Sequence, residues 1–148
     1  MAENTTWPPQ SSAPSSRTAL VPVAPYVLSI LRIVVGLLFL EHGTVKLFGF
    51  PAPMAPPAPF SMLWFAAVIE IAGGALLAVG LFTCAVAFII SGAMAFAYFL
   101  VHAPQSFYPY VNKGELAVVY CFVFFYFVFA GPGPWSLDAL WQRKRGAR

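Results

Sequence analysis

Ionisable residues that could support chemistry fall inside or beside long apolar stretches of this sequence. In the first stretch Glu41 and His42 are adjacent, and Lys46 follows one helical turn later. An imidazole with an acid and a base as neighbours can bind a proton, an anion or a quinone oxygen, or can form an ordinary structural hydrogen bond. The set is Arg32, Glu41, His42 and Lys46 in the first stretch, Glu70 in the second, His102 at the end of the third, and Glu115 at the start of the fourth.

Helical periodicity predicts how these side chains face one another. At about 100° per residue, Arg32 and Lys46 fall on one face of a helix, while Glu41 lies nearly opposite Arg32. In the second stretch Glu70 belongs to a stripe of small residues that would let another helix approach closely. We therefore expect Glu70 to meet the basic face of the first helix. The stripe consists of Ala66, Ala67, Glu70, Gly73, Gly74 and Leu77.

These residues have a functional and a structural interpretation, and the sequence leaves both open. In the functional one they form a polar ligand pocket near the outer ends of the helices, with Glu41, His42, Lys46, Glu70, His102 and Tyr98 as its candidate residues. In the structural one Arg32, Glu70 and Asp138 are ion-pair candidates that only fix helix packing. The sequence contains no familiar catalytic signature and predicts no metal site, so catalytic residues stay unassigned and enzymatic activity stays open.

The elements that must position these residues are four apolar helices. The chain of 148 residues is 60% hydrophobic and only 9% charged, against about 25% charged in ordinary soluble domains. Its four apolar stretches have the length needed to cross about 30 Å of hydrocarbon. The sequence therefore predicts an all-α membrane protein, a four-transmembrane-helix antiparallel bundle. The expected spans are about 26–48, 60–82, 83–103 and 115–131.

The ends of the chain differ from this membrane domain, which we place at 25–134. Residues 1–24 are rich in Pro and Ser and are expected to be a disordered tail, whereas 135–148 form a short basic segment at the membrane interface. The positive-inside rule then places both termini in the cytoplasm. A net charge of +3 is too small and too dispersed for nucleic-acid binding. Cys84 and Cys121 lie in apolar stretches without CxxC spacing, so we expect packed thiols.

The chain also resembles the DoxX family, over about residues 26–140. Four segments carry the resemblance in order: 32–47 (RIVVGLLFLEHGTVKL), 70–83 (EIAGGALLAVGLFT), 112–115 (NKGE) and 131–138 (GPGPWSLD). One departure is Cys84, at a position often basic in that family. The resemblance implies a four-helix protein of the bacterial cytoplasmic (inner) membrane. Some relatives are linked to thiosulfate oxidation with electrons passed to quinone, and others to oxidoreductase complexes that respond to oxidative stress.

Three hypotheses follow from these observations. The first is a subunit of a membrane redox or stress complex that binds a quinone-like or other small molecule in the polar pocket. Because the chain offers no paired cysteines, we expect it to act with a membrane or membrane-associated partner protein rather than as a self-sufficient enzyme. The second is a structural or assembly subunit without a ligand of its own, and the third is a small transporter.

Overall fold

The computed structural model describes residues 21–146, and within that range every regular element is a helix. Local sequence explains where the helices begin and end. Pro25 occupies the first turn of the first helix, and the Ser61 hydroxyl accepts a hydrogen bond from the Trp64 amide at the start of the second. Gly80 ends the second helix at φ 70°, a left-handed conformation that favours glycine. The elements are α1 Ala24–Phe48, α2 Met62–Val79, α3 Thr83–Ala97, the π-helix Tyr98–His102 that continues α3, α4 Glu115–Ala130, and α5 Leu137–Gly146.

These bounds lie close to the expected spans. Helix α1 begins at residue 24, α2 is shorter than expected at each end, and the third stretch changes from an α-helix to a π-helix at Tyr98. Part of the basic segment 135–148 forms α5. Most of the expected disordered tail, residues 1–20, lies outside the described residues.

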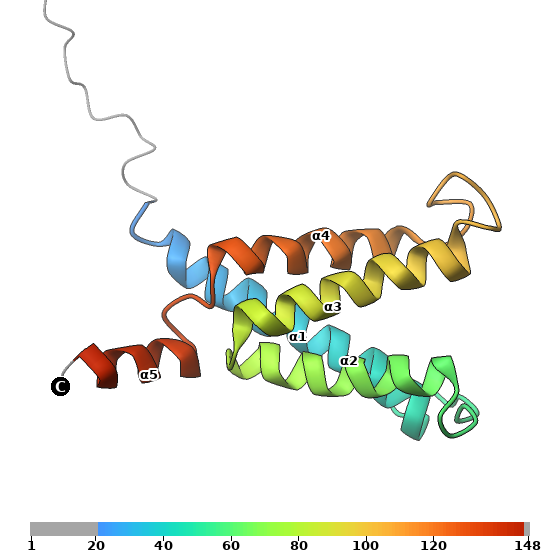
Figure 1. The fold of residues 1–148 in the computed structure, drawn as a ribbon, viewed down its shortest axis with the longest axis horizontal. Coiled ribbons are helices and arrows are strands. Elements are labelled where there is room, and N and C mark those ends of the chain that lie inside the picture. Colours follow the sequence, from blue (N-terminus) through green and yellow to red (C-terminus); the bar gives the residue numbers. More distant parts are fainter. Residues whose placement is uncertain (1–20, 147–148) are drawn as a thin grey trace, which may run out of the picture.

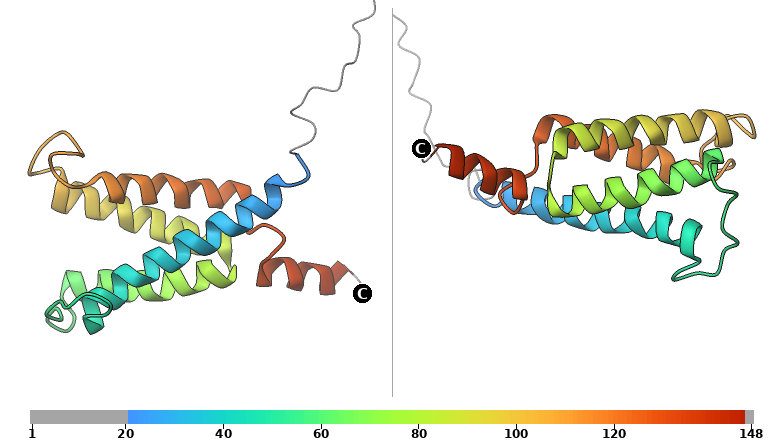
Figure 2. Two further views of the ribbon diagram at one scale, coloured as in Figure 1. Left: turned by 180° about the vertical axis from the view of Figure 1, so that it is seen from behind. Right: turned by 60° about the horizontal axis from the view of Figure 1, so that its bottom comes forward.

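The helices pack as two close pairs, α1 with α2 and α3 with α4 (Figures 1 and 2). Small residues allow the first pair to approach. A methyl group added at Gly74 would lie 2.6 Å from the backbone nitrogen of Leu40 and 2.7 Å from the carbonyl oxygen of Gly36. Because both obstacles are backbone atoms, the glycine stripe of α2 is what brings α1 and α2 together.

An aromatic core lies between the helix pairs. Phe39 of α1 is buried against α4, where its ring centroid lies 4.9 Å from that of Phe124 and 5.6 Å from that of Tyr120, both edge to face. Ile90 of α3 and Phe127 of α4 belong to the same buried cluster. This core fixes the helix positions from which the polar side chains project.

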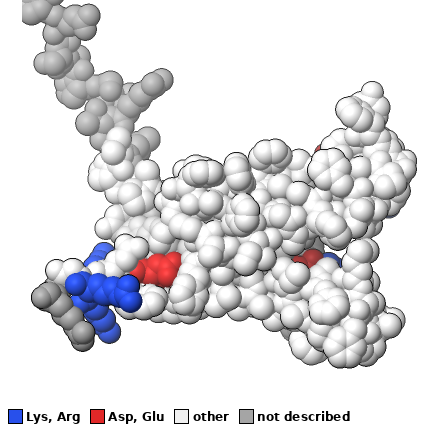
Figure 3. Space-filling view, in the orientation of Figure 1, with Lys and Arg blue, Asp and Glu red and all other residues white. Residues whose placement is uncertain are grey.

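Long apolar helices cover most of the visible surface. Within residues 21–146, three helical segments are long and apolar enough to cross a membrane: Ala24–Phe48, Met62–Val79 and Thr83–His102; α4, with 16 residues, is a shorter apolar helix. Phe88, Phe122 and Phe129 are more than half exposed. Figure 3 shows charged side chains gathered near α5 and in a hollow at the other end, with a largely uncharged surface between them. Such a surface suits lipid rather than water.

Candidate functional site

Polar side chains from the helices gather at two ends of the molecule. We call one the turn end, which comprises the connection 80–82, the segment 131–136 and the start of α5. The other is the loop end, which comprises the connections 49–61 and 103–114. Figure 2 shows α5 leaving the turn end while both long connections lie at the loop end. The two ends hold different kinds of charge arrangement.

At the turn end the guanidinium of Arg32 is fully buried. It donates to the carbonyl oxygens of Leu77 and Ala78 in the last turn of α2, and the Leu77 carbonyl also accepts from the amide of Gly80, which ends that helix. It also donates to the carbonyl of Pro132 at 2.8 Å and to that of Trp135 at 2.5 Å. Arg32 therefore ties the end of α2 to the segment that leads from α4 to α5.

Asp138 ties α5 to the same turn. Its two carboxylate oxygens accept hydrogen bonds from the amides of Phe82 at 2.9 Å and Thr83 at 2.8 Å, at the N-terminus of α3. Its own amide donates to the carbonyl of Gly80 at 2.9 Å. The sequence predicts Arg32 and Asp138 as candidates for ion pairs. In the structure each of them bonds to backbone groups, and no ion pair joins them within the described residues.

At the loop end Lys46 of α1 meets Glu70 of α2. The Lys46 Nζ lies 2.5 Å from Glu70 Oε1, and the two side chains are 24% and 5% exposed. The second carboxylate oxygen, Glu70 Oε2, is buried and has no hydrogen-bond partner within residues 21–146. Lys46 reaches Glu70 because helical periodicity places it on the α1 face that packs against α2.

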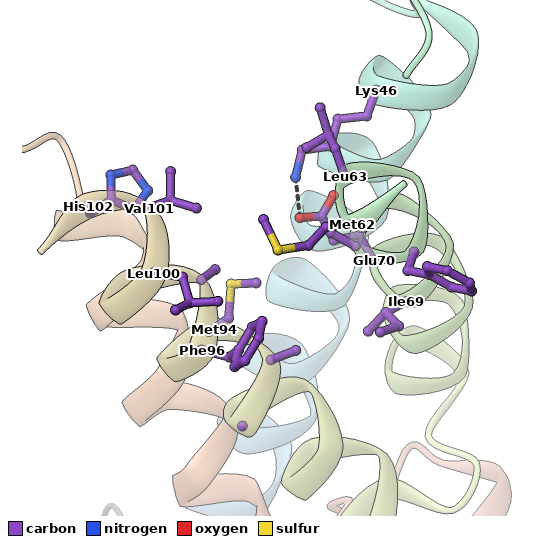
Figure 4. Close-up of a pocket in the computed structure, with 15 residues that line it drawn as sticks. Lys46, Met62, Leu63, Ile69, Glu70, Met94, Phe96, Leu100, Val101 and His102 are labelled. Atoms are coloured by element: carbon purple, nitrogen blue, oxygen red, sulfur yellow. Dashed lines mark hydrogen bonds and ion pairs between the residues drawn. The ribbon is translucent and has the colours of Figure 1, made fainter. Parts of the chain in front are cut away.

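A cavity of about 450 Å³ opens beside this ion pair, between α2 and the third helical segment. Figure 4 shows Lys46 and Glu70 on one side of the pocket and His102 on the other. The remaining lining is apolar or glycine: Met62, Leu63, Phe65, Ala66, Ile69, Gly92, Ala93, Met94, Phe96, Ala97, Leu100 and Val101. The pocket is thus an apolar cleft with a few polar groups, the usual composition of a small-molecule site.

His102 is held at the pocket by the connection that follows it. Its Nδ1 lies 2.9 Å from the carbonyl oxygen of Asn112, and because a carbonyl can only accept, a neutral His102 carries its proton on Nδ1 and presents Nε2 as an acceptor. Asn112 is buried and ties the connection together by donating to the Ser106 carbonyl and accepting from the Gly114 amide. The ring of Tyr98 is stacked 6.4 Å from that of His102, although Tyr98 does not line the pocket.

The structure separates the other two candidates from this pocket. Glu41 and His42 are exposed on α1 and are not among the residues that line it. The His42 ring lies 5.8 Å from that of Tyr120 on α4. Of the six pocket candidates, the structure therefore brings together Lys46, Glu70 and His102.

Sequence reasoning missed two features that shape the pocket wall. The π-helix Tyr98–His102 changes the helical register just before His102, and such bulges are frequent at functional sites. Asn112 anchors His102 through its backbone carbonyl, a contact that leaves no side-chain signal. In the sequence, the stretch 112–115 is notable for its ionisable Glu115 and for the family resemblance, and neither observation indicates that Asn112 holds His102.

No cluster of three or more His, Cys, Asp or Glu side chains suited to a metal ion occurs in the described part of the chain. Cys84 is exposed at the start of α3 and Cys121 is half-buried in α4, and both are free thiols. The pocket chemistry therefore has to be argued from the ammonium, carboxylate and imidazole groups that line it.

The apolar helices and the polar groups gathered at their ends define a multi-pass integral membrane protein, which contacts lipid along its sides. The chain belongs to the DoxX family, whose sequence model matches residues 27–103. The family assignment is thereby confirmed; the match includes the segments 32–47 and 70–83 and ends before the segments 112–115 and 131–138.

One relative is similar to most of the chain. It is an uncharacterized protein of Haemophilus influenzae, 46% identical over 126 residues that cover 81% of this chain and 94% of the relative. No solved structure matches the chain.

Proposed function

We propose that the chain crosses the bacterial cytoplasmic membrane four times as an antiparallel bundle formed by α1 to α4. The 16 residues of α4 span about 24 Å at 1.5 Å per residue, so flanking residues would complete the crossing. Arg143, Lys144 and Arg145 of α5 favour a cytoplasmic turn end under the positive-inside rule. The loop end, and with it the polar end of the pocket, would then face outward.

In this proposal the pocket binds a quinone-like or other small hydrophobic molecule, and the chain serves as a subunit of a membrane redox or oxidative-stress complex. The observation that carries the proposal is the pocket itself. A volume of about 450 Å³ lies within the range of about 300–1,000 Å³ typical of small-molecule sites. The apolar walls suit a ring or alkyl chain, while Lys46 and His102 offer polar contacts at one end.

The redox context rests on the family rather than on a catalytic group of this chain. Some DoxX relatives are linked to quinone-dependent or stress-responsive oxidoreductase complexes, and this chain shares their family. We therefore assign it the part of a quinone-side subunit whose catalytic groups belong to a partner protein.

A pocket-filling variant tests ligand binding. Gly92 lines the pocket, and a methyl group added there would meet no atom within 4 Å, so Gly92→Leu should fold normally and fill the cavity. We expect it to weaken the binding of a decyl-substituted benzoquinone, measured on protein in lipid nanodiscs, at least about tenfold, because the leucine and the ligand compete for the same space.

The matched control is Ala85→Leu, which adds similar bulk to an exposed position of α3 outside the pocket. His42→Ala is a second control, because His42 lies outside the pocket as well. Equal quinone binding by wild type, Gly92→Leu and both controls would contradict the proposed site.

Orientation is tested through the native thiol of Cys84, which is exposed at the turn end. In Cys121→Ala cells, a membrane-impermeant maleimide should label Cys84 only after the membrane is permeabilised. A cysteine introduced at the exposed Tyr110 of the loop end should react in intact cells. The reverse pattern would contradict the assigned orientation.

A second candidate function is that of a structural or assembly subunit. It is favoured by the ion pair of Lys46 and Glu70, which joins α1 to α2 directly. Under this alternative, Glu70→Gln would release a partner protein during mild detergent purification and would leave quinone binding unchanged. Loss of quinone binding at unchanged partner content favours the pocket function instead.

A further inference from the structure

The Lys46–Glu70 ion pair has unused hydrogen-bonding capacity. An ammonium carries three donors, and Lys46 Nζ makes one hydrogen bond within the described residues, to Glu70 Oε1. The other carboxylate oxygen, Glu70 Oε2, makes none although it is buried. A buried charged oxygen without a partner is costly, so this pair calls for a further polar group.

The unused donors and the unused acceptor belong to the same ion pair, and both residues line the pocket. Glu70 Oε2 itself is closed off from the cavity, so a ligand reaches it only when the side chains beside it move aside. Among the polar groups that an organic ligand can carry, a hydroxyl is the smallest that can accept a hydrogen bond from Lys46 and donate one to Glu70 at the same time. A ketone or an ether could only accept, and an ammonium could only donate. The Lys46–Glu70 pair would therefore favour a ligand with a hydroxyl over a ketone, an ether or an ammonium that has the same apolar part.

We infer that the pocket takes an amphiphile whose polar end is a hydroxyl, such as a long-chain phenol or alcohol, bound with that hydroxyl on the Lys46–Glu70 pair. This inference rests on the proposed function, because it needs the pocket to bind a ligand. The apolar body lies along Phe65, Phe96 and Leu100, which line the same cavity. Figure 4 shows that Met62 and Met94 lie between the ion pair and Leu100, and their flexible thioethers adapt to different ligand shapes.

Two probes that differ only by a methyl group on the oxygen test the inference. They are para-octylphenol and its methyl ether para-octylanisole, tritiated and measured by scintillation proximity on protein in nanodiscs, with empty nanodiscs to subtract partitioning into lipid. Wild-type protein should bind the phenol at least about tenfold more tightly than the ether, because the ether has no proton for Glu70 Oε2. Equal affinities, or tighter binding of the ether, would overturn the inference.

The variant Glu70→Gln tests where the preference arises. With its amide oxygen toward Lys46, glutamine presents an NH₂ donor in place of Oε2. The preference should then fall to less than about threefold or reverse, since either probe oxygen can accept from that donor. Glu41→Gln removes the same charge at an exposed position outside the pocket and should keep the wild-type preference. A preference retained in Glu70→Gln would contradict the assignment to this carboxylate.

The outcomes separate the two levels of the proposal. If both probes bind equally well and Gly92→Leu abolishes their binding, the proposed pocket stands and the preference for a hydroxyl alone is overturned. Binding that Gly92→Leu leaves unchanged would overturn the pocket and this inference together. If Glu70→Gln fails to fold, the comparison of the two probes on wild-type protein still decides the question.

Discussion

Replacement of Arg32 by Met should lower the free energy of unfolding by several kcal/mol, because each buried carbonyl that loses its hydrogen bond and stays unsatisfied costs about 1–3 kcal/mol. Arg32 makes hydrogen bonds to the carbonyls of Leu77, Ala78, Pro132 and Trp135. A hydrogen bond to a charged group contributes about 1.5–3 kcal/mol. The simple sum over these contacts overestimates the effect, because wild-type folding also has to desolvate the guanidinium.

The loss can be measured as the midpoint and slope of unfolding in a titration of mixed micelles with sodium dodecyl sulfate. Arg32→Lys should lose about half as much, since lysine keeps the charge but cannot reproduce the planar fork of donors. Arg143→Met removes an exposed charge from α5 and should stay within about 0.5 kcal/mol of wild type.

Hydrogen–deuterium exchange adds a local measurement. Arg32 holds the Trp135 carbonyl, three residues before Asp138, and Asp138 caps the amides of Phe82 and Thr83. In Arg32→Met these two amides should therefore exchange faster. A variant within about 1 kcal/mol of wild type, with the amides still protected, would refute the reasoning that Arg32 closes the turn end.

Three further changes give measurable expectations. Asp138→Ala should cost about 1–2 kcal/mol through loss of the α3 cap, with Asp138→Asn closer to wild type, and equal melting of the two variants would contradict this role. Gly74→Ala should lower the melting temperature clearly, because its methyl group meets backbone atoms of α1. Gly92→Ala should raise the melting temperature slightly, because alanine has the higher helix propensity. Equal melting temperatures of the two variants would contradict the close approach of α1 and α2. Lys46→Met should lower the free energy of unfolding by about 3–5 kcal/mol, because it leaves Glu70 unpaired. The double variant Lys46→Met with Glu70→Leu should recover part of that loss in the same unfolding titration. Losses that add up would contradict the coupling of the two residues.

The helices could be predicted closely because their signal is local. Apolar stretches bounded by proline and glycine determine where α1 and α4 begin and end, and the periodicity of α1 places Arg32 and Lys46 on the face that packs against α2. The small-residue stripe likewise indicates the close approach at Gly74. Each of these inferences depends on residue type and spacing alone.

The partners of Arg32 could not be predicted, because they are backbone carbonyls, which every residue carries. The π-helix Tyr98–His102 depends on packing against the rest of the chain, and none of its residue types predicts the change of register.

The two charged ends can be told apart by how fully the protein itself satisfies them. The guanidinium of Arg32 has five N–H donors and makes four hydrogen bonds to carbonyls, so little capacity remains for a ligand and its role is to hold the turn end together. Lys46 makes one hydrogen bond, and Glu70 Oε2 makes none within residues 21–146. Within the described residues this incompletely satisfied pair lines the cavity of about 450 Å³ and Arg32 does not, which supports the proposal that a ligand binds at the loop end while Arg32 stabilises the turn end.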